Sequence, residues 1–252
     1  MTPPSLLERP DTLPLRSPTS VRELGRIVVL APHPDDESLG CGGLLALAQQ
    51  FGQRPHIVVV TDGVQSHPNS ITHPPCVLMG LREREACDAV AELGMTDDQI
   101  TFARFADCGV PRPYEAGFDA ACNRLRTLLS PLDADTLFVP WRGDPHRDHE
   151  AVWLLARAVA PKLPRLPRWV EYPVWAWAHP SSEHAPRTNQ ADAWRLEISD
   201  VVEQKQTAIA AHRSQTTDLI ADDKDGFRLS ADFLAHFAVP FEVYLTPHDA
   251  PC

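Results

Sequence analysis

Short apolar runs alternate with longer segments of mixed polarity along most of the chain. The first run, over 27–31, is short, β-branched and uncharged, which is typical of a strand buried on both faces of a parallel sheet. Such strands are predicted over four ranges: 27–31, 56–60, 100–105 and 136–140. Helices are predicted between and after them, over 38–50, 81–93, 118–129 and 150–162. Strands and helices that alternate at this spacing predict an α/β fold, a Rossmann-like doubly wound, mostly parallel sheet flanked by helices.

The last third of the chain has a less regular pattern. An aromatic strand is predicted over 169–177, a helix over 201–213 and a final strand over 241–246. We expect residues 164–252 to cap the sheet edge and the functional site. Residues 1–25 are rich in proline and lack the apolar core of a secretory signal, so they form a loose arm or cover a sheet edge. The expected organisation is therefore an arm over 1–25 and a single domain over 26–252.

Two clusters of acids and histidines follow two of the predicted strands. His33, Asp35 and Asp36 come after the strand 27–31, and the sequence HRDH at 146–149 follows the strand 136–140. Open α/β sheets bind ligands at the carboxyl ends of their strands, so the clusters can converge there. Acids close to a buried strand are costly unless something pairs with them, and a divalent metal ion is an economical partner.

Spacing within the clusters supports a shared metal site. His33 and Asp36 are three residues apart, as are His146 and His149, and side chains at this spacing share one face of a helix. Imidazole and carboxylate together suit zinc, with iron, cobalt or manganese also possible. Spacing does not decide whether His146 or His149 is the ligand. Taken singly, each cluster could also be a surface turn or a solvated helix N-terminus, where acids complement the helix dipole.

Composition narrows the class of partner. The chain has 252 residues and a formal net charge of -11, which argues against binding to nucleic acid or to an anionic membrane surface. No apolar run approaches the length of a membrane span. The six cysteines form no C-x-x-C pair, which is typical of idle thiols in a reducing compartment, so a cytoplasmic location is expected. The oligomeric state is not fixed by the sequence.

The motif PHPDDESLGCGG at 32–43, together with HRDH at 146–149, resembles the PIG-L/LmbE-like zinc deacetylases. Members of that family remove acetyl or other acyl groups from amino sugars, chiefly N-acetylglucosamine joined to another group. Weaker matches occur in the expected order, in TDG at 61–63, in the segment from Arg82 to Gly94, at Asp107 and in the segment from Lys205 to Gln215. The resemblance implies an N-deacetylase that acts on a small acylated amino sugar, such as an N-acetylglucosamine conjugate.

The resemblance also implies roles for individual residues. His33, Asp36 and His149 resemble the metal ligands of the family, with Zn²⁺ as the cofactor or another divalent transition metal in its place. Asp35 resembles the general base, which takes a proton from the attacking water and returns it to the departing amine. The remaining roles are stabilisation of the oxyanion by His146, orientation of that ring by Asp148, and contacts to substrate by Arg82 and Asp107.

Other interpretations remain open at this point. The same chemistry could act on a non-sugar amide, such as a thiol conjugate or an antibiotic acyl chain, or the chain could be a sugar-binding relative without turnover. A dinucleotide-binding loop at Gly40, Gly42 and Gly43 is disfavoured because the glycine rule requires glycine where Leu45 stands. Several further side chains could serve the site or the fold: His67, His73, Trp169, Tyr172, Trp175, Trp177, His212 and Gln215.

Overall fold

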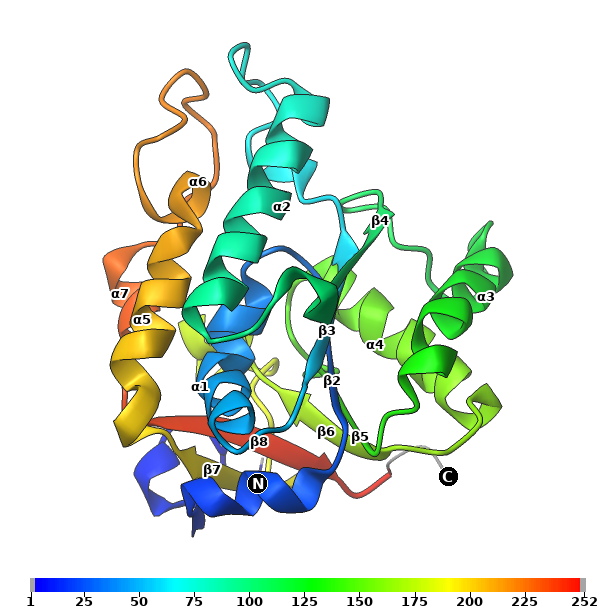
Figure 1. Ribbon diagram of the computed structural model, residues 1–252, viewed down its shortest axis with the longest axis vertical. Coiled ribbons are helices and arrows are strands. Elements are labelled where there is room, and N and C mark those ends of the chain that lie inside the picture. The colour runs from blue at the N-terminus through cyan, green and yellow to red at the C-terminus, as the bar shows by residue number, and fades with distance from the viewer. Residues whose placement is uncertain (1–2, 250–252) are drawn as a thin grey trace.

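The computed structural model describes residues 3–249, so the first two residues of the expected arm and the last three of the C-terminal segment lie outside it. Within that range, an 8-stranded sheet lies between two layers of helices (Figure 1). Most neighbouring strands are parallel, which confirms the predicted fold class. None of the helices in residues 3–249 combines the length and the apolar character needed to cross a membrane.

The strand order reverses direction between β5 and β2, in the middle part of the sheet. The order is β1-β7-β8-β6-β5-β2-β3-β4, and β8 is antiparallel to both of its neighbours. The chain runs outward from β2 to β3 and β4, then returns to β5 on the other side of β2. This reversal is the topological switch point at which open sheets bind ligands. The strands are β1 (Leu15–Arg16), β2 (Ile27–Ala31), β3 (His56–Thr61), β4 (Ile100–Phe105), β5 (Thr136–Pro140), β6 (Arg168–Tyr172), β7 (Ala191–Glu197) and β8 (Phe241–Pro247).

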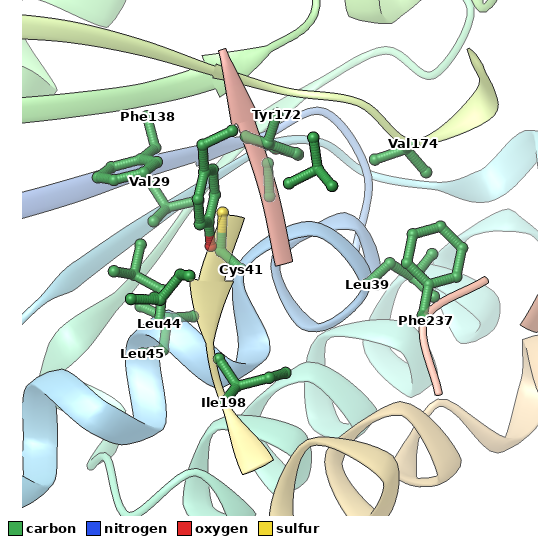
Figure 2. Packing of buried hydrophobic residues seen from close by; sticks show 14 of the residues in the cluster. Val29, Leu39, Cys41, Leu44, Leu45, Phe138, Tyr172, Val174, Ile198 and Phe237 are labelled. Carbon is green, nitrogen blue, oxygen red and sulfur yellow. The ribbon is translucent and has the colours of Figure 1, made fainter. Parts of the chain in front are cut away.

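Helices cover both faces of the sheet (Figure 1). They are α1 (Asp36–Gln50), α2 (Pro75–Glu92), α3 (Phe118–Leu129), α4 (Arg147–Val159), α5 (Val202–Ala211), α6 (Arg213–Thr216) and α7 (Ala231–Ala235). Successive side chains of β2 point to opposite faces of the sheet. Val29 packs in the core beneath α1, α2 and α5, and Val28 packs in the core beneath α3 and α4. Figure 2 shows part of the first core, including Leu44 and Leu45 of α1. Burial on both faces explains why the strands are continuous apolar runs.

The glycines of α1 allow the helix to lie close to its neighbours. A Cβ atom at Gly40 would overlap the ring of Tyr172, and one at Gly43 would lie 2.6 Å from Cγ2 of Ile198. Both glycines are buried within the helix rather than in a loop that could cradle phosphate. The glycine run therefore serves packing, and the dinucleotide-binding interpretation has no structural basis.

Four elements differ from the sequence-based expectation: α2, the aromatic strand β6, β1 and β7. Helix α2 begins at Pro75, inside the expected loop 64–80, because proline fits the first position of a helix, where its missing N–H is not needed. The aromatic strand ends at Tyr172, since the N–H groups of Val174 and Trp175 donate to the carboxylate of Asp144 instead of to a neighbouring strand. Strands β1 and β7 were not predicted, and β1 pairs with β7, so Leu15–Arg16 of the expected arm form the edge strand of the sheet.

Candidate metal centre

The two acidic-histidine clusters meet at the switch point between β2 and β5. His33 follows β2 by two residues, and His146 is the N-cap of α4, which follows β5. The ring centroids of His33 and His146 are 4.5 Å apart, and those of His33 and His149 are 5.4 Å apart. Parallel pairing of β2 with β5 brings the two cluster-bearing turns side by side, as their positions in the sequence predicted.

Asp36 lies between the two buried histidines. Its Oδ2 atom is 3.1 Å from Nδ1 of His33 and 3.1 Å from Nε2 of His149. All three side chains are buried. Two imidazole nitrogens and a carboxylate oxygen, contributed by turns that are far apart in the sequence, therefore converge on one point.

Each of these histidines also faces a carboxylate with its other nitrogen. Nε2 of His33 is 3.3 Å from Asp148 and 3.3 Å from Asp107. Nδ1 of His149 is 3.6 Å from Oδ1 of Asp144, slightly beyond a hydrogen bond. A carboxylate behind the imidazole is the usual arrangement for a histidine that binds metal, because it fixes the tautomer and raises the basicity of the ring. The sequence analysis did not identify Asp144, although its position just before HRDH was a signal.

Unpaired polar atoms indicate that this centre suits a cation. Both ring nitrogens of His149, Oδ1 of Asp148 and Oδ1 of Asp144 are buried without a hydrogen-bond partner among residues 3–249. Such atoms are costly to bury unless something satisfies them. Burial opposes charge on His149, but the carboxylates of Asp36 and Asp144 outweigh it and raise the pKa of His149 to about 9. The donor set and the demand for positive charge both fit a divalent transition metal.

More than one combination of side chains could reach an ion here. Possible ligand atoms of His33, His146 and His149 lie within 4.8 Å of one another, and so do those of His33, Asp107 and Asp148. In the second combination, each carboxylate already accepts a backbone hydrogen bond. The N–H of Cys108 donates to Asp148 at 2.7 Å, and the N–H of Gln65 donates to Asp107 at 2.8 Å. Both combinations share His33, so the centre is one cluster rather than two separate sites.

Asp35 lies at the start of α1 beside a buried arginine. Its Oδ2 atom is 3.1 Å from Nη2 of Arg82. Arg82 also donates two hydrogen bonds to carbonyl oxygens, from Nη2 to Pro34 at 2.7 Å and from Nη1 to Gly63 at 2.8 Å. Burial raises the pKa of Asp35 to about 6, although the positive charge of Arg82 opposes the rise. Arg82 borders the cavity, but its guanidinium is used within the protein. It differs in this respect from the substrate-contacting residue that the resemblance implied.

A buried ion pair supports the unusual backbone of Asp35. The φ angle of Asp35 is 148°, and its N–H donates to Oε2 of Glu37 at 3.0 Å. The other oxygen of Glu37 is 3.0 Å from Nε2 of His212, which lies just after α5. His212 was one of the candidates whose role the sequence left open. Glu37 was missed, because an acid near a helix N-terminus is usually solvated and only the tertiary structure buries it.

His146 is held as a neutral ring. Its Nδ1 atom accepts the backbone N–H of Asp148 at 3.2 Å, which leaves the proton on Nε2. Burial and the nearby His33 and His149 lower the pKa of His146 to about 4. The expectation was that the side chain of Asp148 orients this ring, whereas its backbone N–H does so, and its carboxylate lies against His33.

The centre opens into a cavity of about 590 Å³, within the range of about 300–1,000 Å³ that is usual for ligand pockets. Of the other candidates from the sequence, Trp175 and Gln215 line the cavity, whereas Trp169 and Tyr172 are buried in the core and His67 is buried beside Ser66. The cavity is lined by His33, Asp35, Asp36, Leu39, Gln65, Ser66, Arg82, Asp107, Cys108, Pro145, His146, Trp175, Ala178, His179, Gln215 and Phe227.

Comparison with known proteins identifies the family. The model of the PIG-L family, described as GlcNAc-PI de-N-acetylase, matches residues 28–160, which include both acidic-histidine clusters. The chain belongs to the PIG-L family. The matched range covers the switch point of this PIG-L protein, from β2 to the end of α4, and leaves the cavity-lining residues Trp175, Gln215 and Phe227 outside.

Similar proteins include known or probable deacetylases. A probable N-acetyl-alpha-D-glucosaminyl L-malate deacetylase 2 of Bacillus cereus is 27% identical over 207 residues, which cover 78% of this chain and 86% of the relative. The crystal structure of the conserved protein TT1542 of Thermus thermophilus matches with 28% identity and a TM-score of 0.58, over 75% of this chain and 79% of that one. N,N'-diacetylchitobiose deacetylase of Pyrococcus horikoshii shares the fold, with 22% identity and a TM-score of 0.62, over 80% of this chain and 74% of that one.

Proposed function

We propose that this PIG-L protein is a zinc-dependent N-deacetylase that hydrolyses the acyl amide of an amino sugar, in a conjugate of the N-acetylglucosamine type. The observation that carries the proposal is the convergence of Asp36 Oδ2 with a ring nitrogen of His33 and of His149, beside a cavity that His33, Asp35 and Asp36 line. A carboxylate that can act as a base next to a metal centre is the arrangement needed for amide hydrolysis.

His33, Asp36 and His149 would hold the ion, Zn²⁺ or another divalent transition metal. Three protein ligands suit a catalytic rather than a structural site, because they leave a position open. When bound there, the ion polarises the amide carbonyl and lowers the pKa of a water molecule. Carboxylates face the second ring nitrogen of each histidine ligand and would fix its orientation. Asp107 and Asp148 face Nε2 of His33, and Asp144 faces Nδ1 of His149.

Asp35 acts as the general base and then as the general acid. With a pKa of about 6, its carboxylate is ionised at neutral pH and accepts a proton from the attacking water. The same carboxyl group then delivers that proton to the nitrogen of the departing amine as the amide bond breaks. Arg82 is a positioning residue, because it ties Asp35 to the carbonyl groups of Pro34 and Gly63.

His146 stabilises the negative charge that develops on the carbonyl oxygen when water adds to the acyl carbon. Since Nδ1 accepts the N–H of Asp148, Nε2 carries a proton that it can donate to a group in the cavity. Losing one such donor typically costs about 2.7–4 kcal/mol in the barrier. Asp107 borders the same cavity, where its carboxylate can accept a hydrogen bond from a sugar hydroxyl.

The test combines metal content with turnover on wild-type protein purified without a histidine tag or added metal. Elemental analysis should find about one transition ion per chain in the wild type and in Asp35→Asn, and almost none in His149→Ala. Asp35→Asn should lose about 10²–10⁴-fold in kcat on N-acetylated amino sugars.

Three results would argue against the proposal. Asp35→Asn that hydrolyses at the wild-type rate would exclude Asp35 as the base. Protein that takes up no zinc would exclude the metal centre. Faster hydrolysis of acylated thiol conjugates or antibiotic acyl chains than of amino sugars would favour the non-sugar amidase, and sugar binding without any turnover would favour the non-catalytic relative.

A further inference from the structure

One wall of the cavity is aromatic. Trp175 lies in the 3-10 turn Trp175–Ala178 after β6, and Phe227 lies between α6 and α7. Their ring centroids are 5.5 Å apart in an edge-to-face arrangement, and Phe233 of α7 stacks behind Trp175 at 4.8 Å. Both front rings line the cavity, and Phe227 is 36% exposed. The wall therefore offers an aromatic surface whose far side is already packed.

This wall is continuous with the proposed reaction centre. The rings of His146 and Trp175 are 6.4 Å apart and inclined by 28°. The backbone N–H of Trp175 donates to Oδ2 of Asp144 at 2.9 Å, while Oδ1 of Asp144 faces His149. A group joined to a sugar whose acyl amide lies at His146 would therefore extend over Trp175.

Hydrogen bonds between two loops hold Phe227 in place. Its N–H donates to the carbonyl oxygen of Ser66 at 2.6 Å. In the same segment, Asp222 accepts the N–H groups of Ile71 and Thr72, each at 2.8 Å. The two loops project at the same end of the molecule, the one between α6 and α7 in orange and the one before α2 in cyan (Figure 1). A wall ordered before binding loses little conformational entropy when a ligand packs on it.

The charges that line the cavity disfavour an anionic group. Among the lining residues that the structure describes, Arg82 is the only lysine or arginine, and its guanidinium already faces Asp35 and two carbonyl oxygens. The carboxylates of Asp35, Asp36 and Asp107 line the same space, and the formal charge of the whole chain is -11. A carboxylate, such as that of the malate named in the Bacillus cereus relative, would meet these acidic side chains, and no lysine or unengaged arginine is among the described lining residues to pair with it.

We propose that Trp175 and Phe227 form a binding site for a neutral, apolar aglycone, an aryl or alkyl group linked to the amino sugar. The inference rests on the proposed deacetylase function, because it takes the sugar to be the group that is deacylated. Two aromatic contacts of this kind typically raise affinity by roughly tenfold beyond the effect of burying apolar area.

The first measurement compares three substrates of the wild-type protein at fixed pH and salt. These are free N-acetylglucosamine, its phenyl glycoside and its malate glycoside. We expect kcat/KM for the phenyl glycoside to exceed that for each of the other two by about tenfold. The gain over the free sugar should appear mainly in KM, since the aglycone is remote from the reacting carbonyl.

Variants assign the preference to the aromatic wall. Trp175→Leu and Phe227→Leu should each bring the ratio of phenyl glycoside to malate glycoside close to one. Leu166→Ala, which removes an exposed apolar side chain outside the cavity, should leave this ratio as in the wild type. An unchanged ratio in both aromatic variants would contradict the assignment.

Binding by Asp35→Asn separates failure of this inference from failure of the proposed function. Calorimetry with the zinc-loaded variant measures affinity for the phenyl and malate glycosides without turnover. Tighter binding of the phenyl glycoside supports the aglycone site, whether or not the wild type hydrolyses either compound. If the wild type hydrolyses neither, the deacetylase proposal is overturned but the aglycone site is not. Equal or tighter binding of the malate glycoside overturns the aglycone site and leaves the deacetylase proposal standing.

Discussion

The carboxylate of Asp144 faces Nδ1 of His149 across 3.6 Å in a fully buried setting. We predict that Asp144→Asn weakens zinc binding by about 10–100-fold, the usual cost of losing a carboxylate behind a metal-binding histidine. Competition with a chromogenic chelator measures this affinity. Asp192→Asn, at an exposed carboxylate near His248, is the matched control and should bind zinc as the wild type does. Equal affinities in the two variants would exclude the role of Asp144.

Arg82 should affect turnover more than substrate affinity. In Arg82→Lys, a single ammonium cannot bridge Asp35 and the carbonyl oxygens of Pro34 and Gly63, so the base is held less firmly. We predict that kcat falls by about 10²-fold, in the range for a misplaced general base, with little change in KM. Steady-state kinetics on the best sugar substrate provide the measurement. A rise in KM at unchanged kcat would instead restore the substrate-binding role that the family resemblance implied.

The rate should depend on pH through Asp35. Burial raises the pKa of Asp35 to about 6, and the base works only when ionised, so kcat/KM should fall about tenfold per pH unit below that value. Arg82 opposes the rise in pKa, so Arg82→Gln should move the acid limb of the profile to higher pH. His146→Gln should leave the limb in place, because His146, with a pKa of about 4, is already neutral there. If the acid limb moves in His146→Gln but not in Arg82→Gln, the limb reports the ionisation of His146 and not that of Asp35.

The buried pair of Glu37 and His212 should make stability depend on pH. Burial opposes both charges, yet each partner favours the other, so the pKa of Glu37 is lowered from its ordinary 4.5 and that of His212 is raised from its ordinary 6.5. The glutamate contribution is complete above 4.5 and lost as pH falls through the lowered pKa. The histidine contribution is complete below 6.5 and lost as pH rises through the raised pKa. The pair should therefore stabilise the fold most between pH 4.5 and 6.5.

Removal of one partner tests this pair. Glu37→Gln should lower the free energy of unfolding by about 3–5 kcal/mol at pH 5.5 and by less at pH 9, since it leaves a buried imidazolium without its counter-ion. Urea denaturation at the two pH values measures the difference. The double variant Glu37→Gln/His212→Gln should recover part of the loss. A destabilisation independent of pH would mean that packing, and not charge, accounts for the effect.

Local sequence predicted the features that depend on neighbouring residues. The parallel strands were recognisable because both faces of the sheet are covered, and the two clusters were recognisable because polar groups follow buried strands directly. Adjacency of β2 and β5 then followed from the general behaviour of doubly wound sheets. This adjacency was enough to predict that the two clusters meet, whereas the choice of His149 over His146 as a ligand came from the family resemblance.

The rest depends on partners that are remote in the sequence. Glu37 is buried only because His212 reaches it from the end of α5, and Arg82 is used internally only because Gly63 and Pro34 present their carbonyl oxygens to it. The end of the aromatic strand at Tyr172 likewise depends on a carboxylate from another loop. No local pattern carries these tertiary relations, so residue type alone could not assign these roles.

The backbone conformation of Asp35 bears on which substitutions at this position would stabilise the protein. Its φ of 148° is a conformation that non-glycine residues rarely adopt, and holding it costs on the order of 1–3 kcal/mol. Selection for thermal robustness alone would favour glycine at position 35, so under the proposed function aspartate there marks a trade-off of stability against activity. Laboratory evolution toward heat resistance without an activity screen should therefore inactivate the protein at this position early, with the rest of the fold intact.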